Sequence, residues 1–122
     1  MNDFASFRDS AEMELDKYSE LLGFHTSSIA PGEIAAKLDL MLSIFDTLER
    51  LEDEAETWAN LKRDEIDKME LTDSAKADKY RWSEEARFYK KVCRKTSNAG
   101  KKLSAIQSRC KFYNQNLNMG GV

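Results

Sequence analysis

The sequence is poor in the residues that turns and β-structure need. Its 122 residues include one proline and five glycines, against 34% charged and 41% hydrophobic side chains. A β-sandwich requires many glycine- or proline-rich turns between short strands, so this composition favours helices. No apolar run approaches the roughly 20 residues that cross a bilayer, and the first residues lack the basic-then-apolar order of a signal peptide. We therefore expect an all-α protein of the cytoplasm, or of the nucleus if the source is eukaryotic.

Cysteine and histidine are equally scarce. Cys93, Cys110 and His25 are the only residues of these two types. If both cysteines lie on one helix, their positions are about 25 Å apart at 1.5 Å per residue, which is beyond disulfide reach. The chain also contains no GxGxxG, GxxxxGK, HExxH, CxxC or GxSxG motif. The sequence therefore predicts a non-enzymatic protein with no catalytic residue, no metal site and no cofactor.

Charge is divided unevenly between the two parts of the chain. Residues 1–78 carry 20 acidic and 8 basic side chains, whereas residues 79–122 carry 2 acidic and 11 basic ones. The formal net charge of −3 therefore describes neither part. Such polarity bears on partners and on self-association rather than on the fold.

Apolar spacing divides the chain into three helical segments. Residues 1–23 repeat apolar side chains every three or four positions, and Asp3 is a suitable N-cap. An acidic segment covers 33–71 and a basic segment covers 75–117, with capping residues at 72–74 between them. The pattern predicts a single all-α domain over the whole chain: a long antiparallel helical hairpin with coiled-coil-like packing plus an N-terminal helix. An uninterrupted helix through 72–74 is the alternative.

The basic segment carries its mostly apolar residues in a stripe with steps of three and four. These residues are Trp82, Ala86, Tyr89, Val92, Thr96, Ala99, Leu103, Ile106, Cys110, Tyr113 and Leu117. Such spacing is typical of a helix-packing seam. In an antiparallel hairpin, Trp82 would lie near Trp58 and Leu61 of the acidic segment. Because the N-terminal helix can cover only part of this seam, we expect a homo-oligomer.

The Lys and Arg residues of the basic segment lie off this seam. Nine of them follow Ala86, without an acidic residue among them. They are Arg87, Lys90, Lys91, Arg94, Lys95, Lys101, Lys102, Arg109 and Lys111. Cations along a helix can follow a phosphate backbone, which gives salt-dependent affinity with little sequence preference. Phe88 and Phe112 lie beside these cations and Tyr113 near them, where rings can stack on bases. The pattern favours binding of single-stranded nucleic acid.

The same charges allow other interpretations. The acidic segment offers a surface to a protein partner through Glu49, Glu52, Asp53, Glu56, Asp64 and Asp67. A small phage-type interaction module that inhibits a host defence or regulatory complex through this surface is the alternative function. The basic face can also pair with acidic surface within or between chains, while packing of the apolar stripe argues against a membrane contact. A purely structural coiled-coil spacer would bind neither partner.

The end of the chain resembles one family. The run from Lys102 to Arg109, Lys-Leu-Ser-Ala-Ile-Gln-Ser-Arg, precedes Phe112 and a polar stretch that ends in two glycines. It looks like the closing helix of phage recombination mediators of the UvsY type. The resemblance implies a helical, ring-forming recombination or replication accessory protein that binds single-stranded DNA and helps to load a RecA-like recombinase past a single-strand-binding protein. It also marks Lys101, Lys102 and Arg109 as DNA contacts.

Overall fold

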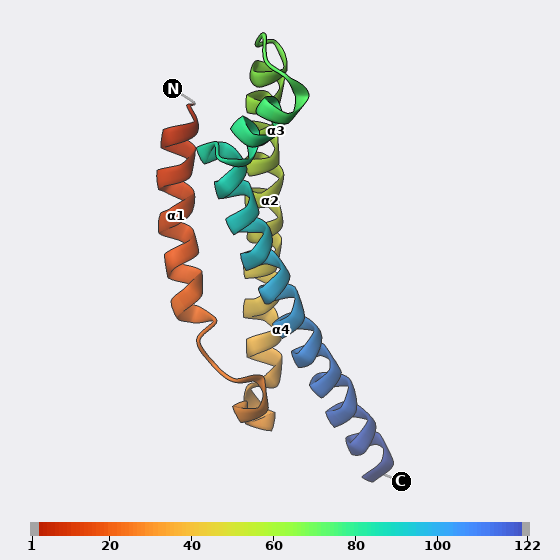
Figure 1. The fold of residues 1–122 in the computed structure, drawn as a ribbon. Coiled ribbons are helices and arrows are strands. Elements are labelled where there is room, and N and C mark those ends of the chain that lie inside the picture. The colour runs from red at the N-terminus through yellow and green to blue at the C-terminus, as the bar shows by residue number, and fades with distance from the viewer. Residues whose placement is uncertain (1–2, 121–122) are drawn as a thin grey trace.

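The computed structural model describes the backbone of residues 3–120 and the side chains of residues 3–111. In this range the chain forms four α-helices: α1 Phe4–Leu21, α2 Ile34–Asp67, α3 Asp73–Arg81 and α4 Glu84–Gly120. Two short 3-10 turns, η1 Thr26–Ser28 and η2 Pro31–Glu33, lie in the connection between α1 and α2. α2 and α4 form a long antiparallel pair, and α1 packs against both (Figure 1). The prediction of an all-α helical hairpin with an N-terminal helix is confirmed.

Two helices begin where the local sequence indicates. Asp3 Oδ1 accepts a hydrogen bond from the backbone N–H of Ser6 at 2.7 Å and caps α1, and this bond lowers the pKa of Asp3 below its ordinary value. Thr72 Oγ1 accepts one from the N–H of Ala75 at 3.2 Å and caps α3. Both side chains satisfy N–H groups that have no partner inside their helix. The expected turn between the two arms is therefore present, although α2 already ends at Asp67.

The prediction of one continuous basic helix over 75–117 is wrong. Trp82 and Ser83 separate α3 from α4. Ser83 Oγ donates a hydrogen bond to the carbonyl oxygen of Tyr80 at 2.6 Å and accepts one from the N–H of Ala86 at 3.2 Å, so a single hydroxyl ends α3 and caps α4. The two acidic residues that follow Ser83 lie in the first turn of α4, where negative charge is favourable. They are the sequence signal of this second break.

The break removes Trp82 from the expected seam. Its side chain is 67% exposed, and the expected partner Trp58 packs instead against Phe4 of α1, with 6.2 Å between ring centroids. Phe88, expected beside the exposed cations, is only 5% exposed. Its ring lies 6.1 Å from that of Phe4 and 5.9 Å from that of Phe7, both edge to face. These contacts hold α1 against the start of α4 and leave Phe88 inside the core.

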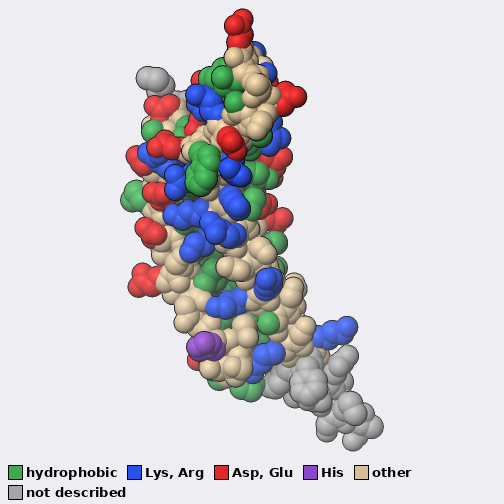
Figure 2. All heavy atoms as spheres, viewed as in Figure 1, with side chains coloured by type: hydrophobic (Ala, Val, Ile, Leu, Met, Phe, Trp, Pro, Cys, Tyr) green, Lys and Arg blue, Asp and Glu red, His purple; other side chains and the backbone are tan. Residues whose placement is uncertain are grey.

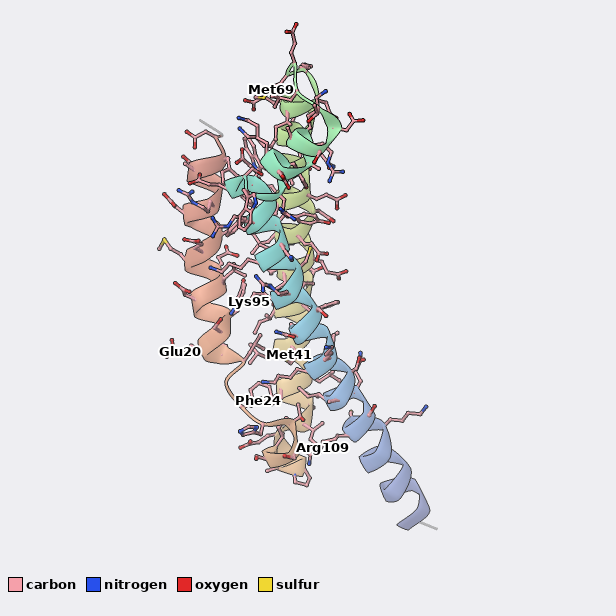
Figure 3. All side chains as sticks on the ribbon, in the orientation of Figure 1. Glu20, Phe24, Met41, Met69, Lys95 and Arg109 are labelled. Carbon is pink, nitrogen blue, oxygen red and sulfur yellow. The ribbon has the colours of Figure 1, made fainter. Side chains whose placement is uncertain are left out.

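The core follows the contact between α2 and α4. Its most deeply buried large side chains are Met41, Leu48, Ile66, Val92 and Ile106. Figure 3 labels Met41 at this contact. In the C-terminal half of α2 the buried face departs from the expected seam, because Ala59 is fully buried whereas Leu61 is 54% exposed. An α-helix has 3.6 residues per turn, so a strict seven-residue stripe drifts by about 20° per heptad around a straight helix.

Candidate nucleic-acid interface

Five of the nine predicted cations lie in one line along the exposed side of α4. We call this line the basic stripe: Arg87, Lys90, Arg94, Lys101 and Lys111. Three exposed serines occupy the intervening positions of the same line: Ser97, Ser104 and Ser108. Steps of three and four residues place all eight on one helix face, over about 36 Å at 1.5 Å per residue. Figure 2 shows Lys and Arg side chains gathered on the face along which α4 runs, with Asp and Glu toward the edges.

Carboxylates of the described side chains do not neutralise the basic stripe. Within the described side chains, none of its five cations lies within 4.0 Å of a carboxylate oxygen. Its charges are also exposed, so water already solvates them and no desolvation penalty limits their number. The stripe therefore presents a positive potential to an anionic ligand.

Two other predicted cations reach α1. Lys91 Nζ lies 3.7 Å from Glu12 Oε1, and Lys95 Nζ donates a hydrogen bond to Ser19 Oγ at 3.2 Å. Figure 3 shows Lys95 between α4 and α1. Each contact is partly exposed, so it contributes little to stability by itself. Together they occupy the side of α4 that faces α1.

The remaining two predicted cations bind the connection between α1 and α2. Lys102 Nζ donates a hydrogen bond to the carbonyl oxygen of Phe24 at 2.7 Å and lies 4.7 Å from the centroid of its ring. The Arg109 guanidinium donates to the carbonyl oxygens of Thr26 and Ile29, the latter at 2.9 Å. Figure 3 shows Arg109 beside this connection. Charged donors thereby satisfy backbone carbonyls that lie outside any α-helix.

The adjacent residues Lys101 and Lys102 test whether the exposed cations of the basic stripe differ in role from the cations that bind other parts of the chain. Lys102→Met removes the donor to Phe24 and to Leu22, so we expect the free energy of unfolding to fall by about 1–3 kcal/mol. Lys101→Met removes an exposed side chain and should change it by less than about 0.5 kcal/mol. Urea denaturation measures both variants, and hydrogen exchange should show faster opening of residues 22–29 in Lys102→Met alone. Equal effects of the two substitutions would contradict the assignment.

The acidic residues predicted for a protein partner lie on α2. All six are exposed except Glu52, which is half-buried. Within the described residues, no ion pair joins α2 to α4. Among the described residues, the one ion pair made by a cation of α4 joins Lys91 to Glu12 of α1. The acidic and basic arms therefore remain separate charged surfaces within one chain.

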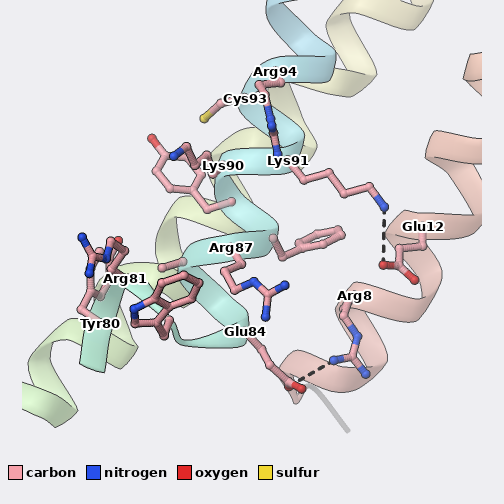
Figure 4. A pocket seen from close by; sticks show the side chains of 14 residues that line it. Arg8, Glu12, Tyr80, Arg81, Glu84, Arg87, Lys90, Lys91, Cys93 and Arg94 are labelled. Atoms are coloured by element: carbon pink, nitrogen blue, oxygen red, sulfur yellow. Dashed lines mark hydrogen bonds and ion pairs between the residues drawn. The ribbon is translucent and has the colours of Figure 1, made fainter. Parts of the chain in front are cut away.

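A cleft of about 860 Å³ lies at the start of the basic stripe, between α1, the end of α3 and α4 (Figure 4). Six Arg or Lys side chains and two carboxylates line it, including the first three cations of the basic stripe. Trp82 is part of the same lining. The Arg81 guanidinium lies 5.4 Å from the centroid of the Trp82 ring and is held by Asp78 at 2.9 Å. The cleft thus combines positive charge with an exposed aromatic ring.

Both carboxylates of the cleft are engaged by cations of the neighbouring helix. Arg8 Nη1 of α1 lies 3.2 Å from Glu84 Oε2 of α4, and Lys91 Nζ of α4 lies 3.7 Å from Glu12 Oε1 of α1 (Figure 4). Both pairs join α1 to α4: in one the cation belongs to α1, and in the other it belongs to α4. Among the described residues, the cations of this cleft that form no ion pair are therefore the first three of the basic stripe.

Two further ionisable groups in the cleft stay neutral near pH 7. Burial raises the pKa of the Cys93 thiol, with a further rise from Glu52. The hydrogen bond with Cys93, followed by burial, raises the pKa of Tyr89 to about 12. Because neither group ionises near neutral pH, the Arg, Lys and Glu side chains set the charge of the cleft. A protonated thiol is also a poor nucleophile.

Sequence reasoning missed three members of this site. Arg8 lies outside the basic segment. Arg81 lies within it but before the first cation of the basic stripe, and Trp82 is predicted in the packing seam. Ser83 and the two acidic residues after it form a helix-start pattern in the sequence. This pattern predicts that a new helix begins after Ser83 and that Trp82 lies outside it. The side chains of Phe112 and Tyr113, the other rings expected near the cations, lie outside the described residues.

Among the described residues, no three His, Cys, Asp or Glu side chains come together as a metal site. No helix in this part of the chain is long and apolar enough to cross a membrane. No protein-family model, curated protein or solved structure matches the chain. The resemblance to the UvsY-type mediators therefore stays a prediction.

Proposed function

We propose that this protein is a non-enzymatic helical protein that binds single-stranded nucleic acid along the basic stripe. The observation that carries the proposal is the exposed line of five cations without a carboxylate partner in the described chain. Phosphates that bind such cations release condensed counterions, which drives association. The serines between the cations add hydroxyl groups, which also bind phosphate oxygens. Because the basic stripe is a single row of side chains, it can follow the phosphate backbone of one nucleic-acid strand.

The length of the basic stripe sets the size of the binding site. At 3.4 Å per phosphate in a stacked strand, its span of about 36 Å corresponds to about ten nucleotides. The charges of its Lys and Arg side chains attract phosphates, which every nucleotide carries whatever its base. We therefore expect affinity with little dependence on base sequence.

The resemblance extends the proposal to a role. It supports a recombination or replication accessory protein of phage type, acting in the cytoplasm with a recombinase as a protein partner. Of the three residues that the resemblance marks as DNA contacts, Lys101 lies on the basic stripe. Lys102 and Arg109 bind the connection between α1 and α2 instead. The role therefore rests on Lys101 and on the basic character of α4.

We also propose that the protein is a homo-oligomer. Leu42 and Leu61 of α2 remain 44% and 54% exposed. Apolar surface of this kind is stabilised when a second copy covers it. Native mass measurement with and without a single-stranded oligonucleotide reports subunit number and binding together. A monomer in both states would contradict oligomerisation and leave nucleic-acid binding standing.

Salt dependence tests the proposed binding directly. We expect a fluorescein-labelled 15-nucleotide oligothymidylate to bind at 50 mM salt, with a slope of log K against log salt of about −3.5 for five phosphate contacts on a single strand. Affinity should then fall about 100-fold between 50 and 200 mM salt. Fluorescence anisotropy measures both quantities. Absence of binding at 50 mM salt would exclude the proposal.

A second candidate function uses the acidic surface of α2. The observation that favours it is that these carboxylates form no ion pair with α4 in the described chain, so a basic protein surface can reach them. The protein would then be an interaction module that inhibits a host defence or regulatory complex. Neutralising Glu49, Asp53 and Glu56 should abolish capture of a defined basic partner while oligonucleotide binding is kept. The reverse outcome would favour the basic stripe.

A further inference from the structure

The exposure of Trp82 is built into the junction between α3 and α4. A tryptophan side chain gains much from burial, yet 67% of Trp82 faces solvent. Ser83 holds both helices at this corner through its bonds to Tyr80 and Ala86. Trp82 is the C-cap residue of α3 at this corner and lies outside the α2–α4 seam. The local hydrogen bonds therefore present the indole at the surface.

The surroundings of Trp82 select a ligand that is both aromatic and anionic. Arg81, held by Asp78, lies over the indole, and cation–π contact of this kind orients a ring. Arg87, Lys90 and Arg94 line the same cleft and are the first three cations of the basic stripe. The volume of about 860 Å³ is in the range of clefts that hold ligand-sized groups. A nucleotide combines a stacking surface with a phosphate and fits this description.

We propose that the cleft is a base-stacking subsite at one end of the nucleic-acid interface. One base of the bound strand stacks on Trp82, while phosphates next to it contact Arg87, Lys90 and Arg94. The inference rests on the proposed function, because the strand on the basic stripe supplies the base. It adds to that function a contact that depends on the base rather than on the phosphate. Every base has a π-face, so this contact does not select a sequence.

The experiment compares two strands of equal length and charge. One is a 15-nucleotide oligothymidylate, and the other carries tetrahydrofuran abasic residues throughout. Trp82→Ala should weaken binding of the base-containing strand by about 5- to 150-fold, the range for loss of one stacked base. It should leave binding of the abasic strand unchanged. Trp82→Phe should recover most of the affinity, and Met13→Ala, which also removes an exposed apolar side chain, should bind both strands as the unaltered protein does.

Fluorescence supplies a second readout that does not require a change in affinity. The chain contains two tryptophans, so Trp58→Phe leaves Trp82 as the only tryptophan, which can be excited without exciting the tyrosines. Its emission should be quenched by the base-containing strand and not by the abasic strand.

The outcomes separate the inference from the proposed function. Salt-dependent binding that Trp82→Ala does not alter would overturn the inference and leave the function standing. Equal weakening of both strands would also overturn it, because stacking requires the bases. If the unaltered protein binds neither strand at 50 mM salt, the function and the inference both fall.

Discussion

Charge reversal at Lys90, Arg94 and Lys101 is expected to weaken binding of a single-stranded oligonucleotide by at least about 100-fold at 50 mM salt. These three cations lie in the middle of the basic stripe, are exposed and have no carboxylate partner in the described chain. Each substitution by glutamate removes one contact with a phosphate and adds a negative charge that repels the strand. The slope of log K against log salt should therefore become shallower by about 2. Fluorescence anisotropy over a salt series measures both changes.

The matched control changes the net charge by the same amount elsewhere. Lys17, Lys68 and Lys79 are exposed and lie outside α4. Their reversal to glutamate should leave the salt slope near its original value and reduce affinity far less. Thermal unfolding of both triple variants should match that of the unaltered protein, because none of the six side chains is buried. If the two variants lose affinity equally, net charge rather than the basic stripe controls binding.

Leu48→Ala is expected to lower the free energy of unfolding by about 2–5 kcal/mol. Leu48 is 1% exposed in the contact between α2 and α4, and its carbonyl oxygen lies 3.5 Å from Thr96 Oγ1 of the facing helix. Loss of its side chain leaves a cavity at the centre of the longest helix contact, where the backbone is least able to collapse. A change of this size is a large part of the roughly 5–15 kcal/mol that stabilises a typical domain. The midpoint of urea denaturation reports it.

Leu61→Ala is the control for this substitution. Leu61 belongs to the same helix and was expected in the same seam, but it is 54% exposed. In dilute solution, where the free monomer prevails, its truncation should change the free energy of unfolding by less than about 0.5 kcal/mol. An effect equal to that of Leu48→Ala would show that Leu61 is covered, as it would be in an oligomer. The measurement is repeated at several protein concentrations, because only an oligomer gains stability as the concentration rises. An effect of Leu61→Ala that does not depend on concentration would mean that Leu61 is buried within the single chain.

The helices and most of their buried faces could be predicted from local sequence. Asp3 and Thr72 are caps whose partners lie three residues away, so a short window contains the whole interaction. Apolar spacing also placed Val92 and Ile106 in the core, where both are fully buried. Ser83 is equally local, because its partners lie three residues before and three residues after it, and no proline or glycine marks this break. A helix can end without either residue when a hydroxyl caps the next one.

The sequence by itself determined that α4 is basic and that its cations lie off the packing seam, because charge and helical period belong to one segment. Only the tertiary structure decided which cations remain available to a ligand. Lys102 and Arg109 bind carbonyls about 80 residues away along the chain. Lys101, beside Lys102, points to solvent. The physical reason is that such partners come within hydrogen-bond reach only after α1 and its connection pack on one side of α4, and no local pattern specifies that side.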